Sequence, residues 1–140
     1  MTTETIAPTR SRNLLGPVLW TVQGLLALFY LYGGFTKLAT PINELAKMMP
    51  WAAVHPTLLT FTGVVDLAGG LGILLPALTR IRPRLSVLAA AGMVVLQVLA
   101  MGFHASRGEF AVIPLNVVLL VLAVFVLWGR TRAVPFAVSR

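Results

Sequence analysis

The chain contains no cysteine, and it has few charged residues for its length. Without cysteine it can form no disulfide, no thiolate-ligated iron–sulfur cluster, no c-type haem attachment and no thiol nucleophile. Charged residues make up 11% of the 140 positions, against about a quarter in soluble domains, while 58% of the positions are apolar. A soluble fold of this composition would lack the polar side chains to cover its surface. The composition therefore indicates a protein whose solvent is lipid, and the length allows one domain.

Motifs for metals, phosphates and hydrolysis are also missing. No spacing resembles a zinc or calcium site, so we expect no metal centre, and there is no glycine-rich phosphate loop or serine–histidine–acid arrangement. The formal net charge is +7, which in a soluble protein would suggest nucleic acid. Here the basic residues sit at the ends of apolar runs and are not interleaved with aromatic residues. That distribution favours membrane topology and anionic headgroups, and we expect no nucleic-acid partner.

Four apolar runs of about 20 residues predict four transmembrane helices, because about 20 residues cross a hydrocarbon core of about 30 Å. The runs cover residues 14–36, 57–78, 85–103 and 110–129. None of them alternates apolar and charged faces, as the helices of a soluble bundle do. We expect an all-α fold, an integral membrane antiparallel four-helix bundle over residues 14–130, with polar cytoplasmic tails at residues 1–13 and 131–140.

The basic residues are distributed unevenly between the two sides of such a bundle. Eight lie on one side, and only Lys37, Lys47 and Arg107 lie on the other. The positive-inside rule then places both termini in the cytoplasm, and we expect the inner membrane of a bacterial cell. The eight are Arg10, Arg12, Arg80, Arg82, Arg84, Arg130, Arg132 and Arg140.

The longest connection, residues 39–55, is predicted on the outer side of the membrane. Thr40-Pro41 has the form of a helix start, and apolar residues recur at helical spacing over residues 42–49 before Pro50 ends the run. We expect a short helix in the plane of the interface, with Trp51 as an anchor at headgroup depth. An irregular loop is the alternative.

Asp66 is the only acid within a predicted span. A carboxylate at that depth costs several kcal/mol unless it is protonated, paired or hydrated. Gly63 and Gly70 share its helix face, and small residues let another helix approach closely. Asp66 is therefore expected to face a tight interhelical contact. It is either a hydrogen-bonded strut between helices or a group that accepts protons or binds a ligand.

Three uncharged polar residues are expected at a similar depth. At about 1.5 Å per residue, Tyr30, Gln97 and Asn116 lie about 10–12 Å below the outer ends of their spans, and Asp66 about 15 Å below its own. We expect the four side chains to form one polar layer in the outer half of the bundle. A layer that only holds the helices together is the alternative.

Two further candidates lie above this layer, at the ends of spans. Lys37 either extends to the headgroups or neutralises Asp66 or an anionic group. His104 either caps a helix end or passes protons between outer water and the polar layer, because histidine titrates near neutral pH. The candidate catalytic residues are Asp66 and His104, and the candidate ligand-binding residues are Tyr30, Lys37, Gln97 and Asn116.

The sequence around these residues resembles the DoxX-like family of small four-helix bacterial membrane proteins. The matching segments are GGFTKL at residues 33–38, FTGVVDLAGGLGILLP at 61–76, TRIRP at 79–83, and His104 with Gly108-Glu109. The resemblance covers about residues 20–130. Many relatives carry glutamate where Asp66 stands, so the carboxylate is kept with a shorter reach. The family name comes from a membrane partner of thiosulfate:quinone oxidoreduction, which implies a quinone as the candidate cofactor.

Two functions therefore compete, and a small-solute transporter, for which four spans would require oligomerisation to make a pathway, is a third. The first is a quinone-associated subunit of a membrane oxidoreductase system; no residue here carries electrons unaided, so it needs a borrowed cofactor or a protein partner subunit. It predicts a cavity around Asp66 that opens to lipid or to the outer face. The second is a non-enzymatic membrane scaffold or assembly factor, which predicts a dry, packed interior and an exposed Met48-Met49-Trp51 surface. A homo-oligomer is compatible with either function.

Overall fold

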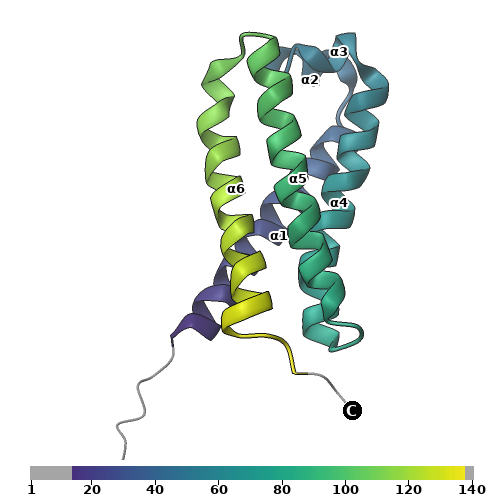
Figure 1. Cartoon of the computed structure of the whole chain (residues 1–140). Coiled ribbons are helices and arrows are strands. Elements are labelled where there is room, and N and C mark those ends of the chain that lie inside the picture. Colours follow the sequence, from purple (N-terminus) through teal and green to yellow (C-terminus); the bar gives the residue numbers. More distant parts are fainter. Residues whose placement is uncertain (1–13, 138–140) are drawn as a thin grey trace, which may run out of the picture.

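The computed structural model describes residues 14–137, and all regular structure in that range is helical (Figure 1). The long helices are α1 (Leu15–Ala39), α4 (Pro56–Thr79), α5 (Arg84–Ser106) and α6 (Ile113–Trp128). A short 3-10 turn, η1 (Phe110–Val112), precedes α6, and a π-helical turn, η2 (Gly129–Ala133), follows it. All four long segments have the length and composition to cross a membrane. The prediction of an all-α, multi-pass membrane bundle is therefore confirmed.

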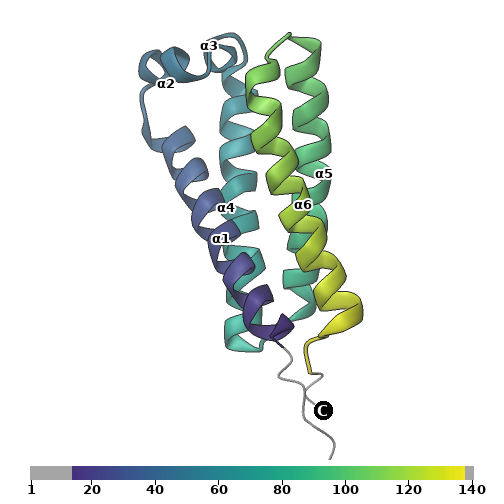
Figure 2. The same cartoon turned by 90° about the vertical axis from the view of Figure 1, so that its left-hand side faces the viewer.

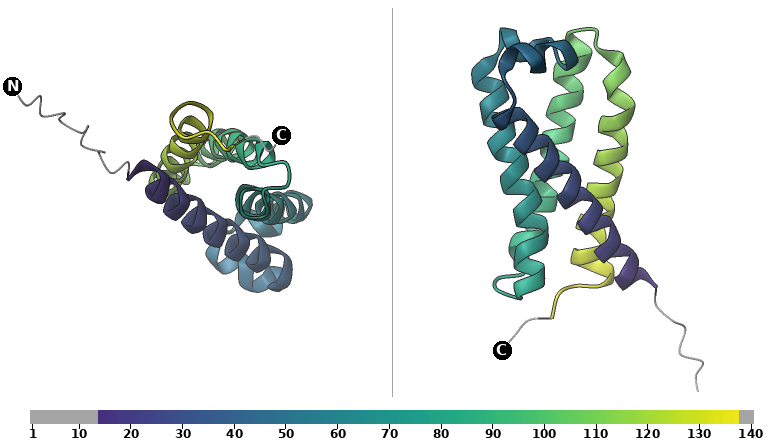
Figure 3. Two further views of the ribbon diagram at one scale, coloured as in Figure 1. Left: turned by 90° about the horizontal axis from the view of Figure 1, so that it is seen from below. Right: turned by 180° about the vertical axis from the view of Figure 1, so that it is seen from behind.

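The four long helices run alternately up and down, so each is antiparallel to the next (Figures 1 and 2). α1 packs mainly on α4, α4 on α5 and α5 on α6, and a smaller contact between α1 and α6 closes the ring. α1 is tilted: it starts beside the C-terminal end of α6 and leans toward α4 at its other end (Figure 3). The bundle is consequently closed between α1 and α6 mainly at one end.

The two ends of the bundle differ in composition. We call one of them the arginine end. It comprises the α4–α5 turn, the start of α1 and the end of α6. The other is the loop end, with α2 (Ile42–Met48), α3 (Trp51–Val54) and the α5–α6 turn. The arginine end carries, within residues 14–137, Arg80, Arg82, Arg84, Arg130 and Arg132.

The helix predicted in the long connection is confirmed as α2, which lies with α3 across the loop end (Figure 2). It begins one residue later than the Thr40-Pro41 pair predicted, because Pro41 occupies the N-cap. Trp51 opens α3 and is only 7% exposed. Its ring packs edge-on against Phe103 with centroids 5.6 Å apart. Trp51 therefore faces the bundle and does not serve as the headgroup anchor that the sequence predicted.

Most of the interior of the bundle is apolar, and so is most of its outer surface. Large aliphatic and aromatic side chains stay exposed along all four long helices, Leu28, Phe61, Leu99 and Val121 among them. In water such exposure would cost about 25 cal/mol per Å², and lipid removes that cost. The buried core between the helices is built from Leu26, Ala27, Tyr30, Ile73, Ala90, Met93, Leu119, Ala123 and Val126.

The predicted tails lie mostly beyond the described part of the chain. Residues 1–13 and 138–140 are outside it. Residues 131–133, assigned from the sequence to the C-terminal tail, continue the last helix as part of η2. Pro135 follows two residues later, and a proline cannot continue a helix.

Candidate functional site

Close packing of α1 on α4 determines the geometry of the site. A Cβ atom on Gly34 would lie 2.8 Å from the carbonyl oxygen of Gly63 and 2.9 Å from the backbone nitrogen of Leu67. The two helices therefore touch backbone to backbone, as the glycine face of α4 predicted. Asp66 lies one turn beyond Gly63 on that face and is 6% exposed. Its carboxylate points at the contact and away from lipid.

This packing brings Lys37 of α1 onto Asp66 of α4. Lys37 Nζ donates a hydrogen bond to Asp66 Oδ2 at 2.7 Å, and the two side chains are 20% and 8% exposed. Of the two behaviours considered for Lys37, the structure has the inward one. Removing one partner of a buried ion pair leaves the other charge uncompensated. The pair therefore couples the end of α1 to the middle of α4.

A second polar pair connects α5 to α1. Gln97 Nε2 donates to the Tyr30 hydroxyl oxygen at 2.6 Å, and both side chains are buried. Gln97 Oε1 is buried and has no hydrogen-bond partner within residues 14–137. A tyrosine hydroxyl can donate as well as accept. The amide can thus bond Tyr30 through either end, and in both orientations its other end stays unpaired.

Asn116 of α6 adds another unpaired amide. The side chain is buried, and its Nδ2 has no hydrogen-bond partner in the part of the chain that the structure describes. A buried polar group without a partner costs about 1–3 kcal/mol. Gln97 Oε1 and Asn116 Nδ2, on the neighbouring helices α5 and α6, both lack a partner within the described residues. They favour a site in which a polar ligand supplies the missing hydrogen bonds.

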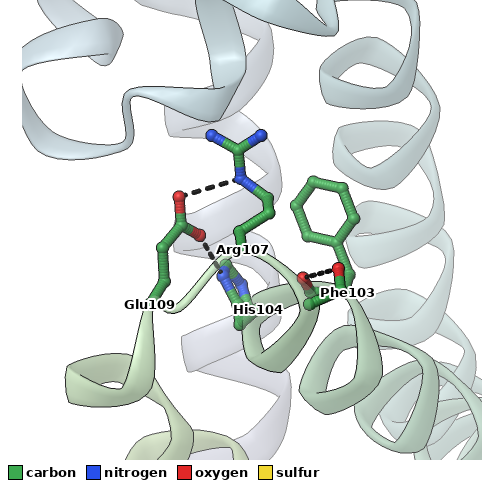
Figure 4. Close-up of polar contacts among 5 residues, drawn as sticks. Phe103, His104, Arg107 and Glu109 are labelled. Carbon is green, nitrogen blue, oxygen red and sulfur yellow. Dashed lines mark hydrogen bonds and ion pairs between the residues drawn. The ribbon is translucent and has the colours of Figure 1, made fainter.

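His104 lies above these pairs, at the end of α5 (Figure 4). Its Nδ1 is 2.7 Å from Glu109 Oε2, and Arg107 Nε donates to Glu109 Oε1 at 2.9 Å. Figure 4 shows the Glu109 carboxylate between the two basic side chains. The hydrogen bond from His104, followed by that from Arg107, lowers the pKa of Glu109 below its usual value. His104 is thus held by an ionised carboxylate, with its side chain 17% exposed.

All six candidate residues line one cavity of about 410 Å³ in the half of the bundle nearer the loop end. We call it the polar cavity. Its remaining walls are apolar and aromatic, and the lining side chains Phe29, Phe61, Leu99 and Leu115 are themselves exposed on the membrane surface. The cavity therefore reaches the lipid-facing side of the bundle. The lining candidates are Tyr30, Lys37, Asp66, Gln97, His104 and Asn116.

The loop end closes the bundle above the polar cavity. Leu45, Trp51, Ala52 and Leu59 form a buried cluster there, with Phe103 packed against it. Trp51 and Phe103 also line the cavity. We call this cluster the apolar roof. These side chains lie between the polar cavity and part of the loop end, whereas the exposed wall residues lie on the lipid-facing side.

The sequence did not reveal a second buried polar network, at the arginine end. Arg130 was counted only as a topology signal, yet it is 5% exposed. Its Nε donates to Gln23 Oε1 at 2.7 Å, and Gln23 Nε2 donates to the carbonyl oxygen of Ile73 at 2.9 Å. The available signal was Gln23, an amide about 14 Å inside the first predicted span. An amide at that depth needs a partner from a neighbouring helix.

The comparisons with known proteins give one match. The sequence model of the DoxX-like family matches residues 21–126. That range includes both polar pairs, the His104 cluster and Asn116. No curated protein and no solved structure matches the chain.

Proposed function

Because the chain belongs to the DoxX-like family, we propose that its polar cavity binds a quinone headgroup, and that the protein is a quinone-associated subunit of a membrane oxidoreductase system. The observation that supports this most is the pair of unpartnered amide atoms in a cavity that reaches the lipid-facing surface. A quinone is a lipid-soluble molecule with two hydrogen-bonding oxygens. It needs both an apolar route and buried polar partners.

The residues of the polar cavity fit such a headgroup. The volume of about 410 Å³ lies within the range of about 300–1,000 Å³ found for small-molecule sites. Asn116 Nδ2 is an unpaired donor for a carbonyl oxygen. The Gln97 amide, paired with Tyr30, can present its oxygen to a hydroxyl or its nitrogen to a carbonyl. The same side chains therefore suit both the oxidised and the reduced headgroup.

When bound, a quinone supplies two-electron, two-proton redox chemistry, and a protein partner must exchange the electrons with it. The chain contributes proton handling. We assign to Asp66 the role of proton acceptor inside the polar cavity, with Lys37 stabilising its ionised form. We assign to His104, partly exposed and held by Glu109, the transfer of protons to the water at the loop end.

The proposed orientation places the arginine end, and with it both chain termini, in the cytoplasm of a bacterial cell. The polar cavity then lies in the outer half of the inner membrane. The alternative function, a scaffold that recruits a partner through an exposed Met48-Met49-Trp51 surface, requires a packed interior. A cavity beside Asp66 and the burial of Trp51 weigh against it.

Binding of a short-chain quinone to the purified protein in nanodiscs tests the proposal. Tyr30→Phe removes one hydroxyl from the polar cavity, and we expect about fivefold weaker binding, the effect of one hydrogen bond of about 1 kcal/mol. Tyr32→Phe is the matched control, because Tyr32 is on the same helix but 74% exposed. Gln97→Leu and Asp66→Asn should also weaken binding. Absence of binding by a protein with intact helices, or equal effects of the two tyrosine variants, would contradict the proposal and favour the scaffold.

A further inference from the structure

The arginine end holds a second cavity, of about 750 Å³. Its lining comes from the α4–α5 turn, the first residues of α5, η2 and the segment after η2, and it includes Arg82, Arg84 and Arg130. We call it the arginine pocket. Seen from the arginine end, the C-terminal segment runs beside the start of α5 (Figure 3). Three arginines from two distant parts of the sequence therefore line one cavity.

No carboxylate offsets this charge within residues 14–137. The three acids of that range are Glu44, Asp66 and Glu109, and all are engaged by cations in the other half of the bundle. None of the described arginines at the arginine end takes part in an ion pair. Clustered cations that lack acidic partners attract an anion from outside the chain.

Arg130 has the geometry of a built binding group. Its Nε is fixed by Gln23, and its guanidinium lies 4.9 Å from the Trp20 ring centroid and 4.4 Å from that of Phe136. The side chain is buried, yet Nη2 has no partner within the described residues. A guanidinium packed against two rings, with one nitrogen left unpaired, keeps donors that phosphate oxygens can accept from.

The other walls of the arginine pocket are apolar and include Leu85, Val87 and Phe136. The pocket lies where the spanning helices end, at the level of lipid headgroups. The start of α5 also faces it, and the positive end of a helix dipole favours an anion. A phosphate group attached to an acyl-chain lipid uses both the guanidinium groups and the apolar walls, whereas a free phosphate uses only the former.

From this geometry we propose that the arginine pocket binds the phosphate headgroup of an anionic phospholipid from the leaflet at the arginine end. Binding would hold the C-terminal segment against the start of α5. The site is separate from the polar cavity and does not depend on the proposed quinone function.

Native mass spectrometry of the full-length protein in detergent tests this, with phosphatidylglycerol and phosphatidylcholine of matched chains. We expect tighter binding of phosphatidylglycerol. The double variant Arg82→Gln/Arg84→Gln should bind it about 25-fold more weakly, about fivefold per arginine near a headgroup. Arg132→Gln is the control: it removes one charge at the same end from an exposed side chain that does not line the pocket, so affinity should change less than twofold, against about fivefold for each pocket arginine.

Three outcomes would overturn the proposal. One is equal binding of the two lipids. Another is an equal loss in Arg132→Gln and in the double variant, which would indicate nonspecific attraction to surface charge. The third is binding of glycerol phosphate or inorganic phosphate as tight as that of phosphatidylglycerol, which would assign the arginine pocket to a soluble phosphate. Circular dichroism of the double variant should show unchanged helix content, because neither arginine is buried.

Discussion

Replacement of Gly34 by alanine tests the packing that positions the Lys37–Asp66 pair. The added Cβ would lie 2.8 Å from the carbonyl oxygen of Gly63, whereas ordinary Cβ contacts begin at 3.4 Å. Backbone atoms cannot rotate away as the end of a side chain can. α1 and α4 would therefore separate locally by about 0.6 Å. Over their contact such a gap loses a quarter or more of the dispersion energy between facing atoms.

The expected cost follows from two opposing terms. Overpacking of this kind costs about 1–3 kcal/mol, while alanine gains about 0.8–1.0 kcal/mol over glycine in a helix interior. Gly24→Ala in the same helix isolates the second term, because a Cβ there would meet nothing within 4 Å. We expect Gly34→Ala to be less stable than Gly24→Ala by about 1–3 kcal/mol, the overpacking cost alone.

The measurement is the free energy of unfolding of both variants in mixed micelles, with circular dichroism as the signal that monitors unfolding. Gly34→Ala should also bind the short-chain quinone more weakly, because its ion pair is displaced from the polar cavity. If the two variants were equally stable, the backbone contact between α1 and α4 would be wrong. The placement of Lys37 on Asp66 would then lose its structural cause.

Three further predictions concern single side chains. Lys37→Met leaves the Asp66 carboxylate without its cation and should lower the free energy of unfolding by up to about 3 kcal/mol. The double variant Lys37→Met/Asp66→Asn should recover most of that loss. A double variant no more stable than the single one would show that the two charges are not coupled. The pKa of Glu109 is lowered in the fold, so the stability that this carboxylate contributes is complete above about pH 4.5 and is lost as the pH falls below that value. Between pH 7 and pH 3 the free energy of unfolding should therefore depend less on pH in Glu109→Gln than in the unmodified protein. Identical pH profiles would refute this. Because the chain lacks cysteine, a thiol introduced at Ser106 should react with an impermeant reagent outside intact cells and one at Ser139 should not; the reverse pattern would invert the proposed orientation.

The fold was predictable because a lipid environment permits very few kinds of fold. Four apolar runs of spanning length, with Asp66 as the one acid among them, admit hardly any arrangement other than a helical bundle. The contact at Asp66 was predictable for a local reason: Gly63 and Gly70 stand on the same helix face as the acid. Depth alone placed Tyr30 and Gln97 at one level, and the structure joins them by a hydrogen bond.

Other features depended on tertiary contacts that spacing does not encode. An aromatic residue after a proline in a loop suits the headgroup region equally well, so burial of Trp51 follows only from Phe103 on a distant helix. The burial of Arg130 was not evident from the sequence, because this residue stands in a basic cluster that already served as a topology signal. Only the partner amide of Gln23, 107 positions earlier, shows that this arginine turns inward.

The apolar roof has a consequence for which molecules ever meet the polar cavity. With Trp51 and its neighbours packed at the loop end, a solute that enters between the exposed wall residues must first dissolve in the bilayer. Its effective concentration at the cavity is then its aqueous concentration multiplied by its partition coefficient. A hydrophilic analogue with the same hydrogen-bonding groups would be depleted before any contact with Asn116 or Gln97. Part of the selectivity of the site would thus reside in the membrane itself, and it would shift with acyl-chain length and packing without any change in the protein.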